Sequence, residues 1–194
     1  MANRVKLYLI RHGHAASGFG EDLDPGLDEL GHAQAAQMAV NMTLELNSDQ
    51  SAAMPFAMIV SPLRRTRETA QPLEQRWGAA ARVESRIAEL PSPDGLSLAD
   101  RLVWLREILP GSWASMPEEL QKWRDNLIAA LLECREDTVA VTHFVAINVA
   151  LSFAAGTDNI MTAQPANCSI TCMESDGQNL FLKRLGSEAE IEIR

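Results

Sequence analysis

Imidazole and guanidinium groups follow three widely separated apolar segments of this chain. The three stretches are Arg-His-Gly-His at 11–14, Ser-Pro-Leu-Arg-Arg at 61–65 and Thr-His at 142–143. An imidazole nitrogen can act as a nucleophile near neutral pH, and a guanidinium group binds phosphate through a planar fork of N–H donors. These residue types together predict chemistry on a phosphate group.

His12 is the candidate nucleophile, because it lies between Arg11 and Gly13 and has a possible partner in the distant His143. Gly13 is expected to leave room for a phosphate to approach the backbone. A single histidine at a strand end is more often structural, but the neighbouring arginine favours a phosphoryl acceptor. An alternative from another class of enzyme is that His12 and His14 bind a metal ion in a hydrolase.

Arg64, Arg65 and Arg67 are predicted in the first two turns of a helix, with Ser61 as its N-cap and Pro62 in the first turn. Cations there oppose the helix dipole by about 0.3–1 kcal/mol each. A bound anion would reverse that cost and would also meet the free backbone N–H groups. The alternative is that these arginines are only solvated.

Apolar runs at 5–10, 56–60 and 138–142 must position these groups. The runs are nearly continuous in apolar residues, which is typical of parallel strands covered on both faces. Helical patterns follow, one starting near Asp28 and another over 144–154. We therefore predict an α/β fold, a three-layer α/β/α sandwich with a mainly parallel central sheet. Ligands bind beyond the carboxyl ends of such strands, so the three stretches should converge on one pocket.

The remaining segments complete this picture. Two late strands are predicted near 169–174 and 179–185, and alternation at 191–193 resembles a short edge strand. The segment 91–117 is rich in Pro, Gly and Ser around a helix over 97–108. We consider it a candidate cap insertion over the site, and the alternative is that its tryptophans fill a secondary core.

Composition indicates one globular domain over 1–194. The 194 residues are 46% hydrophobic and 22% charged, with a net charge of −9. That charge argues against nucleic acid as a partner, and it means that a phosphate site must carry its own local cations. The longest apolar run, 139–155, contains polar residues and is shorter than the roughly 20 residues of a membrane span.

The cysteines Cys134, Cys168 and Cys172 match no metal-binding spacing, and the last two are expected too far apart within one strand to form a disulfide. The start of the chain has no apolar secretory segment. A reduced, cytoplasmic protein is therefore expected. The sequence does not fix the oligomeric state.

Four motifs, in order along the chain, resemble those of the histidine phosphatase superfamily, the phosphoglycerate mutase-like proteins. They are Arg-His-Gly at 11–13, the loop Asp-Pro-Gly-Leu-Asp-Glu-Leu-Gly at 24–31, Ser-Pro-Leu-Arg-Arg-Thr-Arg-Glu-Thr-Ala at 61–70 and Thr-His at 142–143. Asn-Cys-Ser-Ile at 167–170 resembles a later family segment that begins the next strand. The resemblance covers nearly the whole chain.

This resemblance implies roles for five side chains: His12 as the nucleophile, Glu89 as the proton donor, and Arg11, Arg65 and His143 as phosphate ligands. Resemblance alone selects Glu89 from the many carboxylates of the chain. The implied activity is hydrolysis of a phosphate monoester through a phosphohistidine intermediate, with no metal or other cofactor. The implied substrate is a small phosphorylated molecule or a phosphoprotein.

Gly13, His14 and Arg64 are candidate residues of the site's rim. His14 departs from the family pattern, in which an acidic residue or Gln often follows Arg-His-Gly. Pro-Ser-Pro at 91–93 replaces a Tyr- and Gly-containing pattern typical of the mutases. A phosphatase is therefore favoured over a mutase-type phosphotransferase, which is the main alternative. A non-catalytic phospho-ligand binder is a further one.

Overall fold

The protein is described by a computed structural model that covers residues 4–17, 22, 24–48, 56–93 and 95–189. Its strands are β1 (Val5–Arg11), β2 (Ala57–Val60), β3 (Arg82–Val83), β4 (Thr138–Thr142), β5 (Ile170–Ser175) and β6 (Leu180–Arg184). They form one six-stranded sheet in the order β3-β2-β4-β1-β5-β6. The three predicted apolar runs are therefore neighbouring strands in the middle of the sheet.

The sheet is mostly parallel, as predicted. Strand β4 pairs in parallel with β1 and β2, and β2 pairs in parallel with β3. Strand β5 is antiparallel to β1, and β6 is antiparallel to β5. Strand β3 was not predicted, because its two residues are exposed and carry no apolar pattern. The predicted strand at 191–193 lies outside the described residues.

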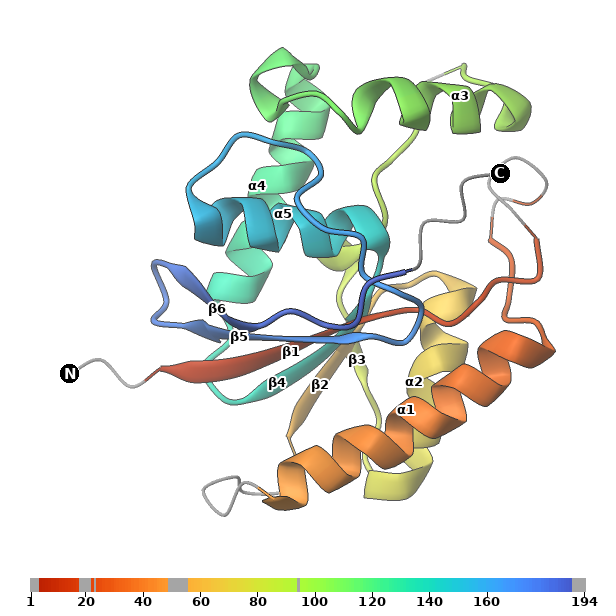
Figure 1. The fold of residues 1–194 in the computed structure, drawn as a ribbon, viewed down its shortest axis with the longest axis vertical. Helices are drawn as coiled ribbons and strands as arrows, with labels where there is room; N and C mark the ends of the chain where they lie inside the picture. The colour runs from red at the N-terminus through yellow and green to blue at the C-terminus, as the bar shows by residue number, and fades with distance from the viewer. Residues whose placement is uncertain (1–3, 18–21, 23, 49–55, 94, 190–194) are drawn as a thin grey trace.

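The helices are α1 (Glu29–Ser48), α2 (Arg64–Trp77), α3 (Leu98–Ile108), α4 (Glu118–Leu132) and α5 (Phe144–Ala155), with short 3₁₀ turns η1 (Ser85–Ile87) and η2 (Trp113–Ser115). Helices α1 and α2 cover one face of the sheet, and α4 and α5 cover the other (Figure 1). Helix α3 lies farther from the sheet on the side of α4 and α5. The three-layer prediction is confirmed.

Alternate residues of the central strands belong to two separate apolar cores. In β1, Leu7 and Leu9 pack in the core shared with α4 and α5, whereas Tyr8 and Ile10 pack in the core shared with α1 and α2. Side chains of a strand alternate between faces, so a strand covered on both faces must be apolar at successive positions. This packing explains the continuous apolar runs in the sequence.

The segment 91–117 supplies part of the larger core. Trp113 is 1% exposed and belongs to that core, and Trp104 packs against it. This packing agrees with the interpretation that the tryptophans fill a core. Leu102 and Val103 of α3 are exposed. That the segment 91–117 covers the site remains a prediction.

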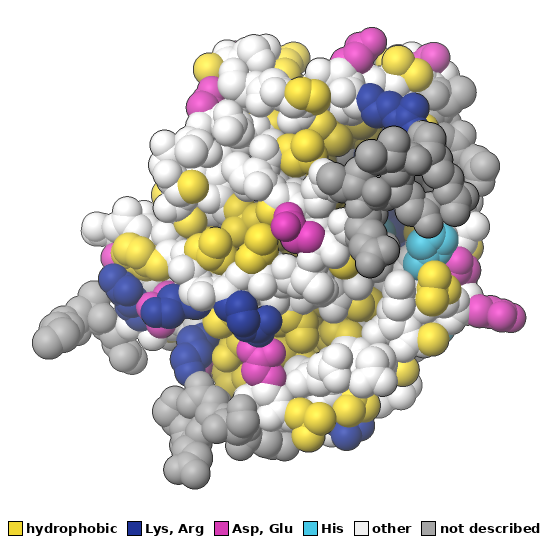
Figure 2. All heavy atoms as spheres, in the orientation of Figure 1, with side chains coloured by type: hydrophobic (Ala, Val, Ile, Leu, Met, Phe, Trp, Pro, Cys, Tyr) yellow, Lys and Arg dark blue, Asp and Glu magenta, His cyan; other side chains and the backbone are white. Residues whose placement is uncertain are grey.

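Surface charges around the β5–β6 hairpin are mostly paired. Figure 2 shows basic and acidic side chains next to each other at that end of the molecule. Arg4 and Lys183 both pair with Glu174, and Arg184 pairs with Glu45. Exposed pairs of this kind each contribute little to stability. Across the described residues, no helix is both long and apolar enough to cross a membrane.

The cysteine thiols are free, as expected from their spacing. Cys168 is not in a strand, however, because β5 begins two residues later. Its φ of 55° places it in the left-handed region, which is uncommon for a residue with a side chain. Cys168 therefore forms the turn that leads into β5.

Candidate active site

The carboxyl ends of β1 and β4 bring two histidines together. Arg11 is paired with Thr142 across these strands, so the next residue of each strand, His12 or His143, lies just beyond the sheet. Their ring centroids are 5.3 Å apart, at an interplanar angle of 61°. His12 is 5% exposed and His143 is 0% exposed, so both imidazoles are buried polar groups.

Arg65, in the first turn of α2, bridges the two imidazoles. Its Nε donates to His12 Nε2 (3.3 Å), and its Nη2 donates to His143 Nδ1 (3.3 Å). The side chain is 5% exposed. A guanidinium group directs several donors in one plane, so Arg65 fixes the relative position of both rings.

The hydrogen bonds of His12 select one tautomer. Its Nδ1 lies 2.7 Å from the carbonyl oxygen of Gly13, which can only accept, so Nδ1 carries the proton. Nε2 is then the nitrogen with the lone pair, and it faces Arg65. Burial, followed by the cation of Arg65, lowers the pKa of His12 to about 3. The imidazole is therefore neutral near pH 7. Asn167 Nδ2 donates to the His12 carbonyl oxygen (2.8 Å) and holds its backbone.

His143 has the opposite tautomer. Because its Nδ1 accepts from Arg65, its Nε2 carries the proton and donates to Ser61 Oγ (2.7 Å). Burial, followed by the proximity of His12 and Arg65, holds the pKa of His143 well below 6.5. His143 is thus neutral in the structure, with both ring nitrogens engaged.

The sequence predicted Ser61 as the N-cap of α2, and this prediction is wrong. The helix begins at Arg64, and Pro62 lies outside it. Ser61 Oγ is instead engaged by His143, and its contact with the Leu63 N–H is 3.4 Å long. The Oδ1 of Asp24, from the loop after β1, accepts from the Arg64 N–H (2.7 Å) and satisfies the helix start.

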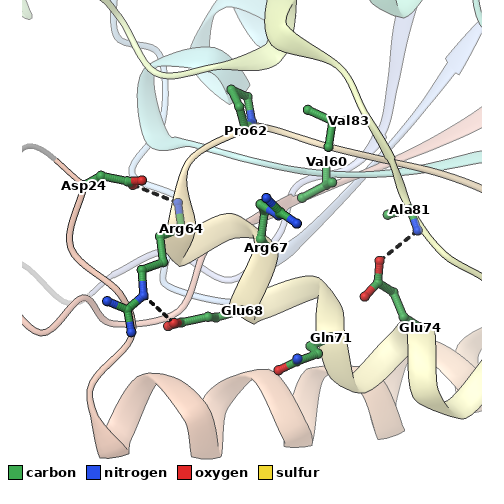
Figure 3. Close-up of a pocket in the computed structure, with 10 residues that line it drawn as sticks. All are labelled: Asp24, Val60, Pro62, Arg64, Arg67, Glu68, Gln71, Glu74, Ala81 and Val83. Carbon is green, nitrogen blue, oxygen red and sulfur yellow. Dashed lines mark hydrogen bonds and ion pairs between the residues drawn. The ribbon is translucent and has the colours of Figure 1, made fainter.

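Among the three arginines in the first turns of α2, Arg65 alone has a described contact with either histidine. Arg64 is exposed and pairs with Glu68 (2.7 Å). This pairing offsets the unfavourable interaction of its charge with the helix dipole at the N-terminus of α2. Arg64 and Arg67 line a cavity of about 350 Å³ that is also lined by Val60 of β2 and Val83 of β3. Figure 3 shows Arg64 directed toward Glu68 and Arg67 lying beneath Val60.

Glu89 follows η1 and is nearly enclosed, at 6% exposure. Its Oε1 accepts from the Leu90 N–H (2.9 Å), and its Oε2 has no hydrogen-bond partner among the described residues. Burial raises the pKa of Glu89, and nearby cations, Arg65 first among them, partly oppose that rise. The turn itself is fixed by Thr142 Oγ1, which donates to the Ile87 carbonyl (2.7 Å). A buried carboxyl group with a raised pKa suits proton transfer.

An ion-pair network braces the turn before Glu89. Glu84 Oε2 accepts from Arg82 (3.1 Å), and Glu84 Oε1 accepts from Arg86 (2.9 Å). Arg86 also pairs with Glu133, at the end of α4 (2.8 Å). The hydrogen bonds from Arg86 are the main reason that the pKa of Glu84 falls to about 2. The loop that carries Glu89 is therefore tied to α4.

Arg11 lies at the edge of this group. Its Nη1 donates to the Pro165 carbonyl (2.8 Å), and its guanidinium carbon lies 5.2 Å from the centre of the Phe144 ring. The guanidinium is close enough to Glu89 to influence its pKa. The structure thus gathers His12, Arg65 and His143 in direct contact, with Glu89 and Arg11 beside them.

The reason for glycine at position 13 differs from the one expected. A Cβ there would lie 2.7 Å from the backbone oxygen of Gly31, so the missing side chain makes room for α1 rather than for a ligand. The Gly13 N–H donates to Thr69 Oγ1 (3.0 Å). Gly13 therefore fixes how β1, α1 and α2 meet.

His14 is directed away from the two buried histidines. It is exposed, and its Nδ1 lies 2.7 Å from Asp28 Oδ2. His12 Nε2 receives an arginine donor, so the imidazoles of His12 and His14 are committed to different partners. Over 4–17, 22, 24–48, 56–93 and 95–189, no group of three or more His, Cys, Asp or Glu residues could hold a metal ion.

Several contacts of the site were not found from the sequence. Ser61, Thr69 and Asn167 position His143, Gly13 and His12 through single hydrogen bonds. All three residues occur in the family-like motifs, but the resemblance assigned none of them a role in the site. Arg101, from α3, contacts the Leu90 carbonyl next to Glu89 (3.0 Å), and no sequence pattern marks it.

The comparison with protein families agrees with this geometry. The family profile described as the histidine phosphatase superfamily (branch 1) matches residues 7–188. The chain therefore belongs to the histidine phosphatase superfamily. Among curated protein sequences, none matches it significantly.

Solved structures show the same fold. The chain is similar to a mycobacterial glucosyl-3-phosphoglycerate phosphatase, with 21% identity, a TM-score of 0.69, and coverage of 96% of this chain and 100% of the other. It is also similar to a phosphoserine phosphatase from Entamoeba histolytica in complex with 3-phosphoglyceric acid, with 21% identity, a TM-score of 0.69, and coverage of 94% and 97%. A protein described as mycobacterial hydrolase 1 has 22% identity and a TM-score of 0.72, with coverage of 96% and 100%.

Proposed function

We propose that this protein is a phosphatase that hydrolyses a phosphate monoester through a phosphohistidine at His12. One observation carries the proposal: His12 is buried and neutral, and its Nε2 lone pair is held against Arg65 beside His143. A neutral imidazole with a defined lone pair is a competent nucleophile, and the guanidinium group is placed to bind the phosphoryl oxygens.

In the first step, His12 Nε2 attacks phosphorus and forms an N–P bond while the ester P–O bond breaks. Glu89, protonated at the start, gives its proton to the leaving oxygen, so the alcohol departs neutral. Arg65 and Arg11 stabilise the charge on the phosphoryl oxygens. The substrate can enter as the monoanion and pass its proton to His143 Nδ1, which then donates to a phosphoryl oxygen; the proton leaves again with inorganic phosphate.

In the second step, the Glu89 carboxylate takes a proton from water as the water oxygen attacks phosphorus. The N–P bond breaks, and inorganic phosphate and neutral His12 are released. Glu89 ends protonated, ready for the next ester. Neither step uses a metal ion or another cofactor, because the side chains supply the cations, the acid and the base.

The substrate is proposed to be a small phosphorylated metabolite, in line with the substrates named for the structural relatives. A mutase would return the phosphoryl group to an organic acceptor. The Pro-Ser-Pro sequence at 91–93, where mutases have a different pattern, favours water as the acceptor. The protein is expected to be located in the cytoplasm.

The test is direct detection of the phosphoenzyme. Rapid quench with a labelled aryl phosphate should trap acid-labile, base-stable phosphate on the wild type. His12→Ala should abolish trapping and lower turnover by at least about 10³-fold, as loss of a covalent nucleophile does. His32→Ala, at an exposed position on α1, is the control and should behave as the wild type.

Three results would overturn the proposal. A His12→Ala variant that keeps full activity would show that the nucleophile is wrong. Activity lost on exhaustive chelation and restored by a divalent ion would favour a metal-dependent hydrolase instead. Recovery of the label in an organic acceptor rather than in inorganic phosphate would indicate a mutase.

A further inference from the structure

Glu89 and α3 are connected through one residue, Leu90. The Leu90 N–H donates to Glu89 Oε1 (2.9 Å), and the Leu90 carbonyl accepts from Arg101 Nη2 (3.0 Å). Leu90 is 0% exposed, so its backbone groups are shielded from water. The carboxyl group and the guanidinium group therefore hold opposite ends of one buried residue.

The residue after Leu90 makes this connection stiff. Pro91 restricts the preceding residue to extended conformations, because its ring clashes with other backbone geometries. The two peptide units on either side of Leu90 cannot then rotate freely with respect to each other. A hydrogen bond that fixes the carbonyl also fixes the direction of the N–H that holds Glu89.

Helix α3 is anchored so that Arg101 faces this loop. Leu105, one turn further along the helix, is 6% exposed and belongs to the larger core. Trp104 packs against the same core, and residues three and four apart share a helix face. Ser97 caps the start of α3 by accepting from the Asp100 N–H. Arg101 thus projects from the anchored face, not from the exposed one.

Charge gives Arg101 a role that its neighbours do not share. Three cations face Glu89: Arg65 from α2, Arg101 from α3 and Arg11 from β1. Each of them lowers the pKa of Glu89 against the larger effect of burial. A phosphate dianion bound by Arg65 and Arg11 would offset their charges, whereas Arg101 is held at the Leu90 carbonyl. In the loaded site, Arg101 is then the main cation acting on the acid.

We propose that Arg101 is a positioning residue for the proton donor: from α3 it fixes the Leu90 backbone, and through it the place of the Glu89 carboxyl group beside the phosphoryl site. This inference rests on the proposed function, because it takes Glu89 as the acid. It also gives the 91–117 segment a catalytic consequence, since α3 must be docked for Glu89 to be held.

The test compares Arg101→Gln with Arg106→Gln, an exposed position on the same helix. Single-turnover kcat/KM is measured on an alkyl phosphate, which needs an acid, and on nitrophenyl phosphate, which needs it much less. Arg101→Gln should slow the alkyl ester by about 10–100-fold and the nitrophenyl ester by less than about 3-fold. Arg106→Gln should change neither rate.

The pH profile provides a readout that a purely structural role would not move. The first step requires protonated Glu89, so activity falls as the pH rises through its pKa. Removing a cation raises that pKa, so the alkaline limb of kcat/KM should move to higher pH in Arg101→Gln. Arg101→Lys keeps the charge and loses the planar fork. The alkaline limb of this variant should therefore lie close to that of the wild type, while its rate on the alkyl ester recovers less.

The Glu89→Gln background separates the two proposals. If Arg101 acts through Glu89, adding Arg101→Gln to the Glu89→Gln variant should lower kcat/KM on the alkyl ester by less than about a further 2-fold. Equal losses in both backgrounds, or an unmoved alkaline limb, would overturn the positioning role. If Glu89→Gln itself slows both esters equally, the assignment of the acid fails instead. Should Arg101→Gln fail to fold, Arg101→Lys carries the comparison of the two esters and of the two backgrounds, and for this variant an unmoved alkaline limb is the expected result.

Discussion

The two sides of the site are built differently. On the side of β1, β4 and α2, every ring nitrogen of His12 and His143 has a partner, and Arg65 joins the two rings. On the other side, Glu89 is held by one backbone N–H and keeps an oxygen with no described partner. In the proposed mechanism, the first side holds the phosphoryl group in a fixed place, and the second exchanges a proton. Changes on the two sides should therefore have different kinetic signatures.

The largest effect is expected from Glu89→Gln, and it should depend on the leaving group. The amide keeps the shape of the carboxyl group but cannot deliver a proton. We expect a loss of roughly 10²–10⁴-fold on an alkyl phosphate and a much smaller loss on nitrophenyl phosphate, measured in single turnovers. A burst of nitrophenol should appear if the second step becomes limiting. The same loss on both esters, without a burst, would contradict the role.

A loss of nearly equal size on every ester is expected from Arg65→Ala. This side of the site holds phosphate whatever the leaving group is, so kcat/KM should fall by roughly 10²–10³-fold on both esters. Arg64→Ala and Arg67→Ala are matched controls on the same helix and should stay within about 3-fold of the wild type, since neither contacts the histidines. Similar small effects for all three would mean that the arginines are only solvated.

A smaller loss is expected from Ser61→Ala, which removes the acceptor for His143 Nε2. His143 is buried, so the lost partner should let the ring change tautomer and weaken its contribution to phosphate binding. We expect a fall of about 10-fold in kcat/KM, again independent of the leaving group. Ser61→Thr, which keeps the hydroxyl, should recover part of the activity. A leaving-group dependence would place Ser61 on the side of the acid.

The smallest effect, on stability rather than on chemistry, is expected from Asp24→Ala. Loss of the capping bond to the Arg64 N–H should lower the free energy of unfolding by about 1 kcal/mol. Urea denaturation measures this change, and Asp24→Asn, which keeps a side-chain oxygen as acceptor, provides the control. An unchanged midpoint would show that another group satisfies the start of α2.

The sequence predicted the sheet centre well because burial leaves a simple pattern. The strand at 138–142 was predicted to the residue, and it is buried at all five positions. Helix α4 was not predicted, although Leu120, Leu127 and Leu131 repeat at helical spacing on its buried face. Both residues of β3 are exposed, so no apolar pattern in the sequence marks this strand.

The site was predictable as far as strand ends determine it. Parallel strands place His12 and His143 at one edge of the sheet whatever the details of packing are. The partners of these residues depend instead on how distant loops pack. The capping of α2 by Asp24 and the contact of Arg101 with Leu90 join residues 40 and 11 positions apart. No local pattern encodes such pairs, and Glu89 required the family resemblance.

The segment that leads into β5 has a consequence for how the protein is made. Asn167 donates a hydrogen bond to the His12 carbonyl, and the Pro165 carbonyl accepts one from the Arg11 side chain. The Cys168 N–H donates to the Arg11 carbonyl. A ribosome releases Arg11 and His12 long before it releases this segment. The nascent chain must therefore carry His12 without these contacts until the strands β1 to β4 have emerged, and closing such distant contacts is slow. The proposed site is thus completed only after the segment 165–168 has been synthesised.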